Sequence, residues 1–146
     1  MTKVALTVFF LVVSATVFAA AADHRFVRLF KFPAAPESAI VAEGDLEPRS
    51  IGSYTLRIYG GGSSQFPTDD FITGIVRPRD GTIEAVHFID VDGDNRAVLV
   101  VLMRSAGSGG YLAADAFRYR NRSIELIGSV AGIEKRPTGF RHCAIS

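Results

Sequence analysis

Short segments in which apolar and polar residues alternate, separated by turn-forming residues, are the feature that most restricts the fold of this chain. From residue 54 to 59 the alternation has a period of two, with Tyr54, Leu56 and Ile58 on one face. Successive side chains of a β-strand point to opposite faces of the sheet, so this period indicates a half-buried strand. The glycine and serine run at 60–64 ends it.

The same combination of strand-like segments and turns recurs along the chain. Further strands are expected at 26–32, 71–76, 82–89, 97–103, 111–119 and 123–127. The turn signals are Arg79-Asp80-Gly81, Asp92-Gly93-Asp94-Asn95 and Arg120-Asn121-Arg122. We expect the first of these to close a hairpin, and the wholly apolar segment 97–103 to be a central strand buried on both faces. Residues 37–43 fit a short helix or irregular structure equally well. The pattern predicts one all-β domain, an antiparallel β-sandwich or flattened barrel of about eight strands.

The first 22 residues have the order of a secretory signal. Lys3 precedes an uncharged, mostly apolar run that ends in four alanines at 19–22. A membrane anchor is the alternative, but the small residues and the polar chain that follows favour cleavage after about Ala22. We expect residues 1–22 to be removed and residues 23–146 to form an exported, soluble domain with no membrane association.

Charge and cysteine content exclude several classes of protein. The chain has 16 basic and 15 acidic residues, and loss of Lys3 with the signal makes the two equal. Nucleic acid is therefore not an expected partner, because phosphate binding needs an excess of Lys and Arg. Cys143 is the only cysteine. A disulfide framework, a thiolate metal cluster and a lipid anchor on an N-terminal cysteine are all excluded, and a free thiol is favoured over a bond between two chains.

Catalytic motifs are missing from the sequence. No serine lies in a Gly-x-Ser-x-Gly elbow, and no phosphate loop or His-Glu-x-x-His motif occurs. His24 and His142 lie near the ends of the expected domain. His87 shares its expected strand face with Ile83 and Ile89, which favours a half-buried structural role. We expect no enzyme activity and no cofactor.

The segment Asp90-Val91-Asp92-Gly93-Asp94 has the spacing of the first three ligands of a calcium loop. Val98 and Val101 occupy the positions at which the closing ligands are required. We therefore favour a hairpin in which Asp and Gly supply the turn geometry, and we expect no metal site.

The most distinctive segment is Arg104-Ser105-Ala106-Gly107-Ser108-Gly109-Gly110-Tyr111. Three glycines in four positions leave the backbone bare, so a partner can approach closely. Composition alone leaves a recognition loop and a flexible hairpin connection equally open.

This loop and its surroundings resemble a known family. Ser108-Gly109-Gly110-Tyr111 resembles the Ser-Gly-x-x-Tyr-type loop of bacterial lysozyme inhibitors. Its wider setting, from Asp90 through the following Ala114-Asp115-Ala116-Phe117, is similar to the periplasmic inhibitors of invertebrate-type lysozyme. The resemblance covers roughly residues 54–127. Ser105 could also stand for the serine of the loop, but Ser108 preserves the four-residue frame.

The resemblance implies a periplasmic β-sandwich that can form a homodimer and that binds invertebrate-type lysozyme. It also implies that the loop enters the lysozyme cleft, where the hydroxyls of Ser108 and Tyr111 bond the two catalytic carboxylates. Gly109 and Gly110 complete the lysozyme-binding loop, and the possible supporting residues are Arg104, Ser105 and Gly107. Hydroxyl donors to an ionised carboxylate make charge-assisted hydrogen bonds, and tyrosine is a common interface hot spot.

Two other functions are compatible with the sequence. One is a carbohydrate-binding or calcium-dependent adhesion module that would use Asp90, Asp92 and Asp94 for metal, with Tyr54 or Tyr59 as a stacking surface. The other is a hydrolase that would use Ser108, for which the sequence places no base.

Overall fold

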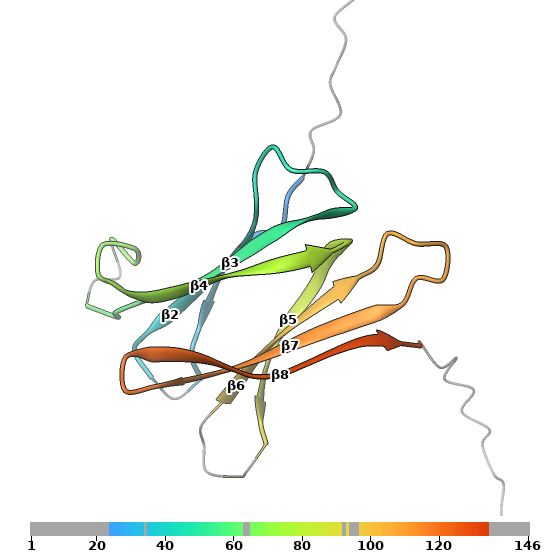
Figure 1. Cartoon of the computed structure of the whole chain (residues 1–146). Helices are drawn as coiled ribbons and strands as arrows, with labels where there is room; N and C mark the ends of the chain where they lie inside the picture. The colour runs from blue at the N-terminus through green and yellow to red at the C-terminus, as the bar shows by residue number, and fades with distance from the viewer. Residues whose placement is uncertain (1–23, 34, 63–64, 92, 94–96, 135–146) are drawn as a thin grey trace, which may run out of the picture.

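The chain folds into two antiparallel sheets that pack face to face (Figure 1). The computed structural model describes residues 24–33, 35–62, 65–91, 93 and 97–134. The first sheet has the order β1-β2-β3-β4, with strands Val27–Lys31, Ser38–Glu43, Ile51–Tyr59 and Phe71–Asp80. The second has the order β5-β6-β7-β8, with strands Thr82–Asp90, Ala97–Arg104, Leu112–Arg120 and Ser123–Ile133. The predicted all-β sandwich of eight strands is confirmed, and the sheets stay separate.

The core lies between the sheets and follows the alternation in the sequence. Tyr54, Leu56 and Ile58 of β3 are fully buried, as their shared face predicts. They pack with residues of the second sheet such as Leu99, Val101 and Phe117. Across the described residues no helix occurs that is long and apolar enough to cross a membrane.

Strand β2 occupies the segment for which the sequence left helix and irregular structure open. It pairs with β1 on one side and with β3 on the other, so its backbone groups are satisfied by two neighbours. Ser38 and Glu43 at its ends are buried together with Ala39, Val41 and Ala42, and Ile40 is partly buried. Burial on both faces removes the period-two signal that identifies a half-buried strand.

The turn Arg79-Asp80-Gly81 does not close a hairpin, so that prediction is wrong. β4 pairs with β3 and β5 pairs with β6, and the turn is instead a corner at which the chain passes from one sheet to the other. Gly81 has a φ of 87° and donates its N–H to the Ser50 carbonyl at 2.7 Å. A Cβ at this position would collide with the carbonyl oxygen of Arg104, so the corner requires glycine.

His87 is exposed, which makes the prediction of a half-buried histidine wrong. The register of β5 shifts between Ile83 and Ala85, so Glu84 is an extra residue in the strand. Such a bulge reverses the faces of the residues beyond it. Ile83 therefore shares the core face with Val86 and Phe88, while His87 points away from the core.

Strand β6 lies between β5 and β7, as a central strand should. Leu99, Val101 and Met103 are buried on its inner face, but Val100 and Leu102 on the outer face are only partly covered. The prediction of burial on both faces is thus wrong for these two residues. No further layer covers the outer face of this sheet in the described part of the chain, so apolar residues there stay half-exposed.

Candidate functional site

The glycine-rich loop connects β6 to β7 at one end of the sandwich. The β2–β3 loop and the β4–β5 corner lie at the same end (Figure 1). Residues 106–109 are exposed, and Tyr111 is 44% exposed although its ring is large and apolar. The end of the sandwich thus presents the loop to solvent on a rigid scaffold, as recognition loops commonly are.

The loop is closed by its own backbone. The Ser105 N–H donates to the Tyr111 carbonyl at 2.9 Å, and the Gly110 N–H donates to the Gly107 carbonyl at 3.1 Å. The second bond makes a tight turn with Ser108 and Gly109 at its corner positions. Gly110 leaves the turn with a φ of 55°, a backbone angle that favours glycine. Ser108 therefore stands at the exposed tip of an ordered turn.

Tyr111 folds back over the tip instead of pointing freely into solvent. A Cβ on Gly109 would collide with three carbon atoms of the Tyr111 ring. The absence of a side chain at Gly109 is what allows the ring to lie against the backbone of the turn. The turn and the Tyr111 ring consequently form one compact unit, which consists of Ser108, Gly109, Gly110 and Tyr111. This unit is the four-residue segment that the sequence singles out.

Arg104 supports the loop from below. Its Nη1 donates to the Gly110 carbonyl at 3.0 Å, and its Nη2 pairs with the Glu84 carboxylate at 2.5 and 2.7 Å. Glu84 is the extra residue of the β5 bulge, and sequence reasoning missed it because a bulge depends on the pairing of two strands.

Ser105 is turned toward the scaffold. Its Oγ accepts the Gly107 N–H at 3.3 Å and lies 3.5 Å from the Asp80 carboxylate of the β4–β5 corner. The two serines of the segment thus occupy different places, since Ser105 braces the loop internally and Ser108 is exposed at its tip.

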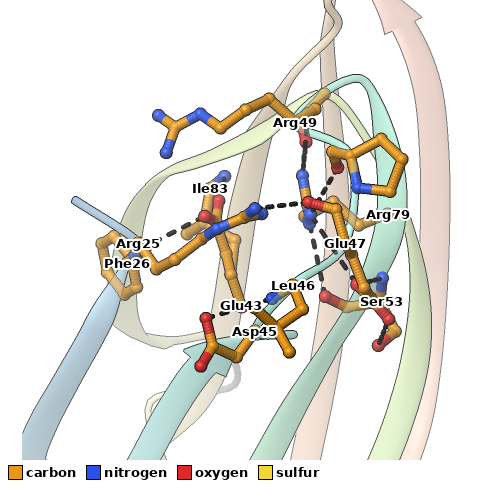
Figure 2. Close-up of polar contacts among 12 residues, drawn as sticks. Arg25, Phe26, Glu43, Asp45, Leu46, Glu47, Arg49, Ser53, Arg79 and Ile83 are labelled. Atoms are coloured by element: carbon orange, nitrogen blue, oxygen red, sulfur yellow. Dashed lines mark hydrogen bonds and ion pairs between the residues drawn. The ribbon is translucent and has the colours of Figure 1, made fainter. Parts of the chain in front are cut away.

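A buried arginine, Arg79, holds the β4–β5 corner that the glycine-rich loop contacts (Figure 2). Arg79 is 2% exposed and donates to the carbonyls of Arg49 at 2.9 Å, Pro48 at 3.2 Å and Gly81. Its Nη2 also lies 3.8 Å from the Glu47 carboxylate. An arginine in a predicted turn is normally solvated, so the sequence carries no signal for this role.

Asp115, which belongs to the Ala-Asp-Ala-Phe segment beyond the loop, is buried between the sheets. It accepts hydrogen bonds from the Tyr54 hydroxyl at 2.6 Å and from the Arg77 Nε at 3.2 Å. Burial acts to raise the pKa of Asp115, but hydrogen bonds from Ser129, Tyr54 and Arg77 outweigh it and the pKa is lowered. Burial and the contact with Asp115 raise the pKa of Tyr54. This cluster joins the sheets, and its members Arg77 and Asp115 line a cavity of about 440 Å³ between β4 and β8.

The strands that flank the aspartate-rich segment, β5 and β6, pair with each other as the arms of a hairpin. The Asp90 carboxylate accepts the Gly93 N–H at 2.8 Å. Asp92 and Asp94 lie outside the described residues, as do Cys143, His142 and the expected signal at 1–22. Among the residues that the structure describes, no group of His, Cys, Asp and Glu is placed to hold a metal ion.

Comparisons with known proteins identify the family. The sequence profile described as "Periplasmic lysozyme inhibitor of I-type lysozyme" (PliI) matches residues 24–138. The crystal structure of PliI-Ah, the inhibitor from Aeromonas hydrophila, is 40% identical with a TM-score of 0.72, over 77% of this chain and 93% of that chain. The structure of Aeromonas hydrophila PliI in complex with Meretrix lusoria lysozyme is 41% identical with a TM-score of 0.71, over 77% of this chain and 89% of the other. No curated protein sequence matches the chain.

The profile covers most of the chain and includes the whole sandwich and its glycine-rich loop. Its members are inhibitor proteins and not enzymes, in agreement with the missing catalytic motifs. The chain belongs to the family of periplasmic lysozyme inhibitors of I-type lysozyme.

Proposed function

We propose that this protein inhibits an invertebrate-type (I-type) lysozyme in the periplasm by inserting the turn Ser108-Gly109-Gly110-Tyr111 into the active-site cleft. The observation that carries the proposal is the placement of this exposed, internally bonded turn at one end of a sandwich of this family. A relative in the family has been solved in complex with a lysozyme from Meretrix lusoria.

The chemistry of the turn suits the cleft of a glycosidase. Lysozyme-type hydrolysis uses two carboxyl groups that flank the scissile bond. Ser108 and Tyr111 supply hydroxyl groups that donate to such carboxylates, and hydrogen bonds to a charged group contribute about 1.5–3 kcal/mol each. The Tyr111 ring adds apolar area in a groove that accommodates sugar rings. The loop contains no glycosidic bond, so it occupies the site without being cleaved.

Pre-organisation strengthens the case for this loop. The turn is held by its backbone bonds and by Arg104, so binding would cost little additional conformational entropy. Ser105 already accepts a hydrogen bond from Gly107 and faces Asp80, which favours Ser108 as the serine that reaches the lysozyme.

The test is an inhibition titration against an I-type lysozyme with matched thermal melts. Tyr111→Ala removes a ring and a hydroxyl, and hot-spot truncations of this kind cost about 2 kcal/mol or more, roughly thirtyfold in affinity. Tyr111→Phe keeps the ring and isolates the hydroxyl. Ser108→Ala should weaken inhibition more than Ser105→Ala, and the exposed positions should leave the melting temperature of the Ser108 and Tyr111 variants unchanged.

Failure has two distinguishable forms. If Ser108→Ala and Tyr111→Ala inhibit as strongly as the wild type, the loop is not the inhibitory element. If the wild-type protein inhibits no I-type lysozyme, inhibition itself is the wrong function for this chain.

We also propose that residues 1–22 direct export and are then removed. The family profile begins at residue 24, just beyond the alanines that suit cleavage, and the family is periplasmic. Intact mass measurement of periplasmic material should give a chain that begins near Asp23. Recovery of a chain that still begins at Met1 would contradict this.

A homodimer formed through strand β8 is the assembly we propose. β8 is an edge strand, residues 126–133 carry no charge, and Val130 is 51% exposed. Long uncharged edges pair readily with a second strand, and a lysine at the edge prevents this. Sedimentation should show a dimer for the mature protein and a monomer for Val130→Lys. A monomeric wild type at high micromolar concentration would rule this assembly out.

A further inference from the structure

Leu46 in the β2–β3 loop combines two properties that a leucine rarely has together. It is 95% exposed, and its backbone has a φ of 60°. The left-handed region is favoured by Gly, Asn and Asp, while a leucine there is strained. An isolated exposed leucine needs no explanation, but one that is both strained and exposed is a candidate for function.

The loop that carries Leu46 is fixed by polar contacts (Figure 2). The Glu47 carboxylate accepts the Ser53 N–H at 2.5 Å and the Ser53 hydroxyl at 2.8 Å. Arg25 donates to the Glu47 carbonyl, and the buried Arg79 donates to the carbonyls of the two residues that follow Glu47. Leu46 is therefore displayed on an ordered loop, and its exposure is not the result of a loose chain.

Contacts also place this loop beside the inhibitory turn. The Ser50 carbonyl at its end accepts the N–H of Gly81, and Gly81 lies against the Arg104 backbone where the turn begins. Ile51 pairs with Asp80, whose carboxylate faces Ser105. Ile51 is itself 68% exposed. The segments that carry three exposed large hydrophobic residues, Tyr111, Ile51 and Leu46, thus meet at one end of the molecule.

We propose that Leu46 is a second contact with the same lysozyme, packing on apolar surface at the rim of the cleft that the turn enters. This rests on the proposed function. A single turn of four residues covers far less area than the roughly 800 Å² per partner of a stable complex, so neighbouring surface at the same end must take part. Leu46 is the most exposed large apolar residue of the described chain, and its loop is rigid, so burying it requires no ordering.

The experiment distinguishes a lysozyme contact from a structural role, because loss of a contact lowers the affinity for lysozyme without lowering the melting temperature. Leu46→Asn removes the apolar side chain but suits a positive φ, so the melting temperature should stay equal or rise. Affinity for an I-type lysozyme should fall about tenfold. Leu46→Met keeps an apolar chain and should retain nearly full affinity. Val91→Ala is the matched control, because Val91 is 64% exposed in the β5–β6 connection at the other end.

A double variant distinguishes direct contact from an effect passed through the turn. If Leu46 contacts lysozyme itself, the losses of Leu46→Asn and Tyr111→Ala should add in the double variant. The proposal is overturned if Leu46→Asn binds like the wild type, or if it adds nothing to Tyr111→Ala. Either result leaves the proposed function intact, provided that Tyr111→Ala alone weakens inhibition. If the wild-type protein does not inhibit the lysozyme, that result would instead contradict the proposed function itself.

Discussion

The unit formed by Tyr111 and Gly109 shows how one missing side chain sets the position of another. The Tyr111 ring lies where a Cβ of residue 109 would be, so the turn and the ring hold each other. A large aromatic residue at 44% exposure would otherwise sample several rotamers. Holding the ring in one place before binding reduces the entropy lost when a partner is engaged.

This arrangement predicts that alanine at two glycines of the same loop has different effects on lysozyme inhibition. Gly109→Ala should displace the Tyr111 ring and weaken lysozyme inhibition about tenfold, with little change in the melting temperature because the turn is exposed. Gly107→Ala is the control, since a Cβ there would meet only the Ser105 Oγ at 3.6 Å. Equal inhibition by both variants would show that the position of the ring does not matter.

At the scale of the elements, the bulge of β5 and the end of β6 cooperate to support the turn. The bulge places Glu84 beside Arg104, and Arg104 bridges Glu84 and the Gly110 carbonyl. Exposed ion pairs of this kind contribute only about 0–1 kcal/mol to stability. Their value here is orientation, because a planar guanidinium can hold two acceptors in fixed directions.

Arg104→Lys tests that role. A lysine keeps the charge but cannot span both acceptors, so we expect inhibition to weaken about threefold to tenfold while the melting temperature changes little. Glu84→Gln should have a smaller effect in the same direction, and Glu125→Gln on β8 is the control. If Arg104→Lys inhibits like the wild type, the bridge does not orient the turn.

At the scale of the whole molecule, the Tyr54, Arg77 and Asp115 cluster ties one sheet to the other. Asp115 of β7 is 2% exposed and accepts from side chains of β3 and β4. A carboxylate buried in this way stabilises the fold only while it is ionised and its donors are present.

The lowered pKa of Asp115 gives the cluster a defined pH dependence. A carboxyl whose folded pKa lies below its unfolded value of about 3.9 contributes stability above that pH, and the contribution is lost as the pH falls through the folded pKa. Asp115→Asn should therefore lower the free energy of unfolding by about 1–3 kcal/mol at pH 7. Thermal melts should show this difference shrinking below about pH 4, while exposed Asp69→Asn stays close to the wild type throughout. A constant difference from pH 7 to pH 2 would contradict the role of the ionised form.

The sequence by itself determined the fold class and the strands other than β2, because an alternation such as that of Tyr54, Leu56 and Ile58 is a local property of the chain. The two-residue turn after β7 is local as well, with Asn121 and Arg122 at φ of 53° and 58°, as its residues suggest. The resemblance that identified the lysozyme inhibitors also rests on a short run of residues, and the family was confirmed.

Only the tertiary structure decided which strands share a sheet and how the loop is held. The Gly81 corner, the Glu84 bulge and the double burial of β2 each depend on pairing between strands that are distant in sequence. The inward turn of Ser105 and the burial of Arg79 follow from that pairing. No local pattern encodes them, because the energy of these contacts comes from neighbours brought together only when the two sheets pack.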